Sequence, residues 1–399
     1  METLSRLQAC RLAIHCQLLN GSTSLDSGTE GVYQAIQHLG YVQIDTISVV
    51  ERAHHHTLWS RCPDYKSQAL DLLLSKERRI FEYWGHLASY LPLSDYRFYL
   101  PYKEKFPWGS NWVKRYWEKF KSATEEVYAR IKAEGALASK DFAAPEAGKR
   151  GTWWDWKPAK SALELLFWKG DLMVSARKGF QRIYDLAERI LPPATDTRLP
   201  TEEEQGEFFV RRALAAHGVA TRREVQLYLS VAPRAAVEIA LGRMTEVEEV
   251  VKLRVEGDEK NEFYMLRSVL EVGTKKPRKK ILHILSPFDS FITNRDRLFR
   301  LFGFAYQLEC FTPVAKRRYG YFCLPMLWGE KLVGRMDAKA ERRQKLLVVK
   351  NLVLDAGFKP DDWFIAALGE RLQEFAQFNS CNSVKVEQTE PERLNINIP

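Results

Sequence analysis

Residues 158–184 constrain the fold most, because they combine a helical pattern, a glycine and two β-rich runs. The helical pattern stops at Gly170, and glycine is common just past the end of a helix. Two runs follow at residues 172–175 and 180–184, and a basic turn joins them. A helix followed by a hairpin with a basic tip is typical of a winged helix-turn-helix unit, whose wing is that tip. The alternative is an α+β hairpin with a solvated tip.

The same order of elements occurs twice more along the chain. In the first hundred residues, helical patterns precede two strand-like runs around Gly85. Further on, Thr201 and Thr221 begin helices with capping residues, and a hairpin pattern follows at residues 245–267. Beyond residue 281, runs of β-forming residues precede a last helix.

These patterns predict an α+β fold of tandem winged helix-turn-helix units followed by a β-rich C-terminal domain. The chain of 399 residues is long enough for two to four domains. The predicted boundaries are 1–110 for the first unit, 111–195 for the second, 196–275 for the third, 281–378 for the β-rich domain with its C-terminal helix, and 379–399 for a polar, disordered tail.

Composition restricts the class of protein. The net charge of +9 suits a polyanion such as DNA, although a modest basic excess also occurs in proteins that bind none. No run approaches 18 apolar residues, so we expect no membrane span. The six cysteines are scattered without a CxxC pair, which favours a reducing cytoplasm and argues against a zinc site. The three adjacent histidines at residues 54–56 cannot converge on one ion from a regular helix, so we expect no metal and no cofactor.

Gln43 and Asp45 are the candidate catalytic residues. The β-branched residues around them predict a short strand, in which residues two apart share a face. A carboxylate and an amide placed side by side can hold and polarise one water molecule. The alternative is structural: Asp45 caps a following helix, and Gln43 is a solvated strand residue.

Cations, imidazoles and aromatic residues follow this pair closely, which suits an anionic ligand. A basic run precedes the strand-like block near residue 320, and a further arginine lies on an alternating strand pattern near residue 335. The residues predicted to contact DNA are Arg52, His54, His55, Arg61, Arg177, Lys178, Arg317 and Arg335.

The run VQIDTISVVERAHHHTLWSR at residues 42–61 closely resembles the bacterial winged-helix-repeat DNA glycosylases, in particular their YcaQ/AlkX branch. That branch carries a Gln-apolar-Asp signature, matched here by residues 43–45, whereas a sister branch has Gln-apolar-Gln. Blocks in the β-rich region resemble the same family, so the likeness spans about residues 30–375. The resemblance implies an enzyme that cleaves the N-glycosidic bond of N7-alkylated guanine in double-stranded DNA. It also implies the unhooking of interstrand crosslinks, and we expect a cytoplasmic, nucleoid-associated monomer.

On this reading, Asp45 is the general base and stabilises a cationic sugar, while Gln43 positions the water. No lysine lies in the pair, so a monofunctional glycosylase that leaves an abasic site is expected. An open concave surface across the duplex, rather than a flipping pocket, follows from the resemblance.

Two other functions fit parts of the sequence. A non-enzymatic winged-helix regulator agrees with the tandem units and the basic charge, but it leaves Gln43 and Asp45 without a purpose. A metal-dependent nuclease normally gathers several carboxylates around its ions, and the sequence shows no such cluster.

Overall fold

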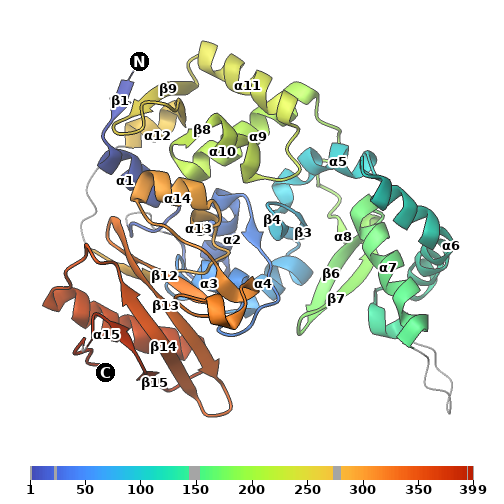
Figure 1. Cartoon of the computed structure of the whole chain (residues 1–399). Helices are drawn as coiled ribbons and strands as arrows, with labels where there is room; N and C mark the ends of the chain where they lie inside the picture. Colours follow the sequence, from blue (N-terminus) through green and yellow to red (C-terminus); the bar gives the residue numbers. More distant parts are fainter. Residues whose placement is uncertain (1, 22–24, 143–152, 273–279, 393, 399) are drawn as a thin grey trace.

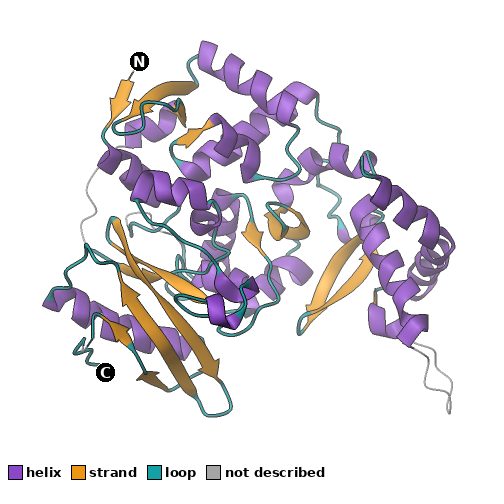
Figure 2. Cartoon of the chain, viewed as in Figure 1, coloured by secondary structure: helices purple, strands orange, loops and turns teal. Residues whose placement is uncertain are grey.

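The computed structural model describes residues 2–21, 25–142, 153–272, 280–392 and 394–398. The chain follows an open arc, with the C-terminal sheet domain at the lower left of Figure 1 and the second unit at the right. The third unit forms the top of the arc, and the first unit lies between the others. Helices dominate the upper and right parts, whereas long strands mark the C-terminal domain (Figure 2). The prediction of an α+β fold, with winged-helix units before a β-rich domain, is confirmed.

The first unit packs helices against a small antiparallel sheet in the order β2-β4-β3. Its elements are α2 (Gly28–Leu39), β2 (Val42–Gln43), α3 (Ala53–Trp59), α4 (Gln68–Asp71) with a π-helical turn (Leu72–Lys76), β3 (Ile80–Trp84) and β4 (Ala88–Pro92), followed by a 3-10 helix (Leu93–Tyr99) and α5 (Leu100–Glu104). Helix α2 ends at Gly40, whose φ of 75° lies in the left-handed region that glycine adopts most readily. This turn directs the chain into β2 at the edge of the sheet.

The second unit contains the predicted wing. Its elements are α6 (Asn111–Glu134), β5 (Leu137–Ala138), a 3-10 helix (Ser139–Phe142), α7 (Trp153–Lys169), β6 (Leu172–Lys178), β7 (Gln181–Leu186) and α8 (Ala187–Ile190). Strands β6 and β7 pair out to Lys178 and Gln181, and Gly179 at the tip has a φ of 61°. The prediction of a hairpin with a basic tip is therefore confirmed.

The third unit also takes in the N-terminal residues. Its elements are α9 (Glu202–His217), β8 (Ala220–Thr221), α10 (Arg222–Tyr228), α11 (Arg234–Glu246), β9 (Val250–Val255), β10 (Phe263–Leu266) and α12 (Arg267–Val272). Strand β1 (Glu2–Leu4) runs parallel to β9, and α1 (Arg6–Cys16) buries Leu12 in the same core as Leu253 and Phe263. The prediction that residues 1–110 all belong to the first unit is thus wrong at its start, because an apolar helix face indicates burial without identifying the partner.

The C-terminal domain is a sheet in the order β11-β12-β13-β14-β15, with β16 also beside β14. Its elements are β11 (Leu282–Ile284), α13 (Ser290–Thr293), α14 (Arg295–Phe302), two 3-10 helices (Glu309–Phe311 and Val314–Lys316), β12 (Cys323–Trp328), β13 (Lys331–Glu341), β14 (Leu346–Leu354), α15 (Asp362–Phe378), β15 (Ser383–Val386) and β16 (Thr389–Glu390). Strands β15 and β16 both pair parallel with β14. The prediction of a disordered tail at residues 379–399 is therefore wrong for residues 383–386 and 389–390, because these residues form strands that the sheet pairs.

One apolar core runs through all three winged-helix units. It includes Leu39 of α2, Leu166 of α7 and Leu214 of α9, each at most 3% exposed. A separate core fills the C-terminal domain beneath α15, and Val50 of the first unit is part of it. The units are therefore fused rather than strung as independent modules. Among the described helices, none combines the length and apolar character needed to cross a bilayer.

Candidate active site

Asp45 is the first residue beyond the edge of the first unit's sheet. Strand β2 pairs Val42 with Tyr90 and Gln43 with Ser89 of β4, and Ile44 N then donates to Ala88 O at 2.7 Å. The predicted strand is present but shorter than expected. Asp45 consequently begins a loop whose first residues are fixed by the sheet.

A local turn holds the Asp45 carboxylate. Its Oδ1 accepts a hydrogen bond from Ile47 N at 2.7 Å. The next helix, α3, does not begin until Ala53, so the alternative in which Asp45 caps a helix is wrong. Burial raises the pKa of the half-buried Asp45 carboxyl above its usual value, and the backbone N–H groups of Ile47 and Thr46 oppose this shift. The fold thus makes Asp45 a stronger base than an exposed aspartate.

Gln43 carries a buried acceptor with nothing to bind. The residue is 3% exposed, and its Oε1 has no hydrogen-bond partner within the described part of the chain. Leaving such an acceptor unpaired costs about 1–3 kcal/mol. A bound water molecule, a bound ion or a catalytic role can account for an unpaired group of this kind. A water molecule or a substrate hydroxyl would satisfy this oxygen.

The C-terminal domain closes one side of the Asp45 loop. Ala340 N of β13 donates to Val49 O at 2.9 Å, and Arg342 Nη1 donates to Ser48 O at 3.0 Å. Ile47 and Val49 pack on the apolar core of that domain. The candidate site therefore lies where the first unit meets the C-terminal sheet. These two parts are far apart in the sequence.

The Asp45 carboxylate and two arginines act on the thiol of Cys310. Burial and the Asp45 carboxylate raise the pKa of the Cys310 thiol, whereas Arg317 and Arg295 lower it. The carboxylate and both cations thus lie within range of the same sulfur. Arg317 had been predicted from sequence, whereas Arg295 and Cys310 had not.

The wing of the second unit contacts α3 directly. The guanidinium groups of Arg52 and Arg177 lie 4.5 and 4.6 Å from the Phe180 ring centroid, and the His54 ring lies 6.2 Å from it. Behind this contact, Arg177 Nη2 donates to Glu82 Oε2 at 2.8 Å. The hairpin of the second unit is therefore fixed against the helix that follows the catalytic loop.

Four of the residues predicted to contact DNA have side chains that the fold buries, so the prediction is wrong for them. Arg61 is paired with Asp289 at 2.7 Å, and both side chains are 0% exposed. The Arg177 side chain is 6% exposed against Glu82, so it holds the wing instead of reaching for phosphate. His54 is 3% exposed, and burial lowers its pKa well below the usual value, which leaves it neutral.

Arg335 is the fourth residue to be corrected. It is 5% exposed and lies 4.2 Å from the Tyr319 ring centroid and 4.5 Å from that of Phe304. Both faces of β13 are buried around it, so the alternation in the sequence did not separate a solvent face from a core face.

The remaining predicted contacts keep some access to solvent. Lys178 at the wing tip is exposed, and Arg52, His55 and Arg317 are partly exposed. His55 accepts or donates a hydrogen bond at Nδ1 with the Tyr65 hydroxyl at 2.6 Å, and burial lowers its pKa to about 4. It is therefore neutral at pH 7 and offers hydrogen bonding rather than charge.

Comparison with known proteins decides the family. The model of the family described as "DNA glycosylase AlkZ-like" matches residues 36–378. The chain belongs to this family. Among solved structures, the DNA glycosylase AlkZ of Streptomyces sahachiroi superposes with a TM-score of 0.66 over 97% of this chain and 100% of that one, at 15% identity. The superposition shows the shared fold, and the resemblance read from residues 42–61 is confirmed.

Sequence reasoning missed several exposed cations of this AlkZ-like glycosylase near its candidate site. Arg343 and Lys345 lie in the turn between β13 and β14, whose Arg342 contacts the Asp45 loop. Arg318 is exposed next to Arg317. These residues belong to two short basic runs of the sequence, and the runs could have indicated a second group of DNA contacts.

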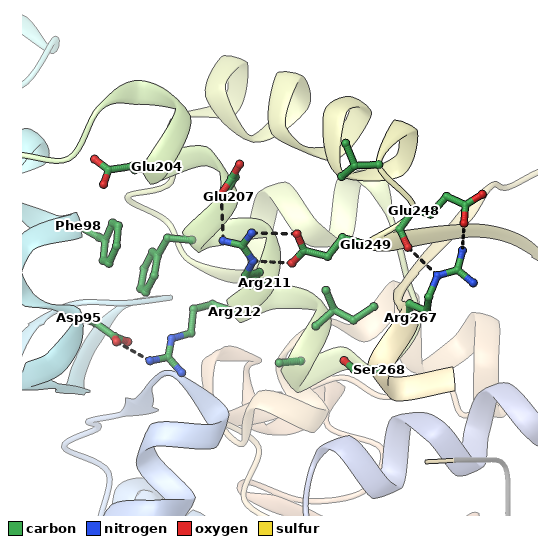
Figure 3. A pocket seen from close by; sticks show the side chains of 14 residues that line it. Asp95, Phe98, Glu204, Glu207, Arg211, Arg212, Glu248, Glu249, Arg267 and Ser268 are labelled. Carbon is green, nitrogen blue, oxygen red and sulfur yellow. Dashed lines mark hydrogen bonds and ion pairs between the residues drawn. The ribbon is translucent and has the colours of Figure 1, made fainter. Parts of the chain in front are cut away.

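Figure 3 shows a cavity of about 1100 Å³ in this AlkZ-like chain, and Asp45 is not among the residues that line it. Its three guanidinium groups are already paired: Arg211 with Glu207 and Glu249, Arg212 with Asp95, and Arg267 with Glu248. A cavity whose cations are neutralised in this way is poorly suited to a DNA phosphate. A smaller cavity of about 420 Å³ is lined by Tyr41, two residues before Gln43, together with His86 and Arg295.

The described residues contain no group of three or more histidine, cysteine, aspartate or glutamate side chains able to hold a metal ion. All six cysteines are free thiols, and five of them are buried.

Proposed function

We propose that this DNA glycosylase hydrolyses the N-glycosidic bond of N7-alkylated guanine in double-stranded DNA, including guanine held in an interstrand crosslink. Asp45 and Gln43 carry the reaction, and an abasic site is the product. The observation that supports this most directly is the buried, unpaired Gln43 Oε1 two residues before a carboxylate of raised pKa.

Alkylation at N7 makes guanine cationic, so the base leaves with the bonding electrons and becomes neutral without needing an acid. The sugar then develops positive charge at C1′, as in other glycoside cleavage. The Asp45 carboxylate stabilises that charge and accepts the proton of the attacking water. Gln43 Oε1 would accept a hydrogen bond from the same water and orient its lone pair toward C1′.

Base loss leaves the sugar–phosphate backbone intact on this mechanism. Strand cleavage through a Schiff base requires an amine at the reacting carbon. The segment from Gln43 to Asp45 contains no lysine. We therefore propose a monofunctional enzyme that acts as a monomer, with Lys178, Arg317, Arg52 and His55 as contacts to the duplex.

The proposal is tested with a duplex carrying one N7-methylguanine, incubated in EDTA and then treated to reveal abasic sites. Asp45→Asn keeps the shape of the side chain but loses its charge and basicity, and we expect base release to fall by about 100-fold or more, a typical contribution of a general base. Affinity for the same duplex should be retained.

Asp362→Asn is the matched control, since Asp362 is an exposed carboxylate at the start of α15. It should release base at the wild-type rate. Full activity of Asp45→Asn would remove Asp45 from the mechanism, and release from a nitrogen-mustard crosslink would separately test the crosslink substrate.

A further inference from the structure

A rigid loop borders the candidate active site and precedes β12. It contains the 3-10 helices Glu309–Phe311 and Val314–Lys316, with Pro313 between them. Cys310 of this loop and Ile47 and Val49 of the Asp45 loop pack on the same apolar core. The Asp45 carboxylate also raises the pKa of the Cys310 thiol, so the two loops lie within electrostatic range of each other at the junction between the first unit and the C-terminal domain.

The tip of this loop exposes two large apolar side chains. Phe311 is 83% exposed and Val314 is 75% exposed. Among the described residues, no large hydrophobic side chain is more exposed than Phe311. Single exposed apolar residues are ordinary, but an aromatic and a branched residue on one short loop form a protruding apolar point.

The base of the loop is held firmly. The Glu309 carboxylate accepts hydrogen bonds from the backbone N–H groups of Arg318 at 2.9 Å, Tyr319 at 2.8 Å and Gly320 at 3.1 Å. Arg317 Nε also donates to Thr312 O at 2.9 Å. Because the backbone is already fixed, presenting Phe311 to a ligand costs little conformational entropy.

Cations stand beside the apolar tip. Lys316 and Arg318 are exposed, and Arg317 between them is partly exposed. An apolar point flanked by positive charge matches the chemistry of a DNA duplex, in which stacked bases lie between two phosphate backbones. Inserted apolar side chains such as Phe unstack and kink duplex DNA in several architectural proteins.

We propose that Phe311, supported by Val314, inserts into the base stack next to the damaged nucleotide and separates it from its neighbour, while Lys316 and Arg318 contact the flanking phosphates. This inference rests on the proposed function, since it assigns the loop to the same substrate duplex. Insertion from the border of the Asp45 loop would open the stack where the glycosidic bond must meet the carboxylate and its water.

The test uses a duplex with 2-aminopurine beside a stable abasic analogue, because 2-aminopurine fluoresces more strongly when it is unstacked. The wild-type chain should raise the fluorescence on binding, and Phe311→Ala should abolish most of that rise. Phe311→Leu should retain part of it, because an apolar wedge remains. Trp363→Ala is the control: Trp363 is 82% exposed on α15, and its loss should leave the signal unchanged.

Single-turnover release of N7-methylguanine from duplex DNA supplies the second measurement. Phe311→Ala should slow release by about tenfold or more, with a smaller change in affinity, since the base stack must then be opened without an inserted side chain. An unchanged fluorescence rise in Phe311→Ala would overturn the inference, whether or not base release is slowed. If the wild-type chain unstacks the probe through Phe311 but releases no base, the proposed glycosylase activity is wrong, whereas the inferred insertion of Phe311 is supported.

Discussion

At the scale of single residues, the fold treats Gln43 and Asp45 in opposite ways. Asp45 is held by Ile47 N in a local turn and remains half-buried, whereas Gln43 is buried with its Oε1 unpaired. The Asp45 carboxylate can accept a proton, and Gln43 Oε1 can accept a hydrogen bond from a water molecule. The residue types and their spacing could be read from the sequence. The unpaired oxygen could not, because it depends on how β4, more than 40 residues further along the chain, packs beside β2.

The raised pKa of Asp45 predicts a pH profile for base release. Because Asp45 acts only when ionised, kcat/KM should be constant at neutral pH and fall as the pH drops through the pKa of the free enzyme. Burial raises that pKa, so the midpoint should lie above the value of about 3.9 for an unperturbed aspartate. The profile is measured with N7-methylguanine duplex, after subtracting spontaneous base loss without enzyme. A midpoint at or below the unperturbed value, or the same limb in Asp45→Asn, would contradict the assignment.

At the scale of elements, ion pairs to one buried glutamate fix the wing of the second unit to the first unit. Glu82 of β3 is 0% exposed at its side chain and accepts from Arg177 and also from Arg182 Nε at 2.9 Å. One buried carboxylate thus holds both strands of the β6–β7 hairpin on the first unit. Lys178 is then presented at a fixed position rather than on a free tip.

Because Glu82 makes both of these ion pairs, we expect Glu82→Gln to lower the free energy of unfolding strongly. Removing one partner of a buried ion pair leaves an uncompensated charge, at a cost of about 3–5 kcal/mol. Urea unfolding at pH 7 should show that loss. Glu30→Gln is the control, because Glu30 pairs with Arg79 at a site where both side chains are more than a third exposed, and exposed pairs contribute little. Equal stability of the two variants would show that the wing is not held by Glu82.

Elements with local signals were predictable from sequence, and those set by distant partners were not. Thr201 and Thr221 form the expected capping boxes with Glu204 and Glu224, since both partners lie within one turn. Strands β15 and β16 escaped prediction because they pair in parallel with β14, far back in the chain. Arg61 was misjudged for the same reason: Asp289, which neutralises it, lies 228 residues away.

At the scale of the whole molecule, buried polar groups tie the C-terminal domain to the first unit. Arg61 and Asp289 form one such link, and His56 Nε2 bonds Ile284 O of β11 at 2.8 Å as another. The candidate site at this junction keeps its geometry only while both parts stay packed. Seven of the eight histidines have pKa values lowered by burial, so the packed state holds them neutral.

These histidines predict that stability falls in mild acid, well above the pH at which carboxylates titrate. Below the ordinary histidine pKa of about 6.5, the unfolded chain binds protons that the folded chain does not, so stability decreases as the pH falls. Burial lowers the pKa of His56 to about 4, which corresponds to roughly 2 kcal/mol lost between pH 7 and pH 5 from this residue alone. Urea midpoints at pH 7, 6 and 5 measure the loss. His56→Asn should be less stable than wild type at pH 7 but should lose less on acidification, because one neutral buried imidazole is gone. A midpoint that stays constant from pH 7 to pH 5 in the wild-type chain would show that the junction does not depend on neutral histidines.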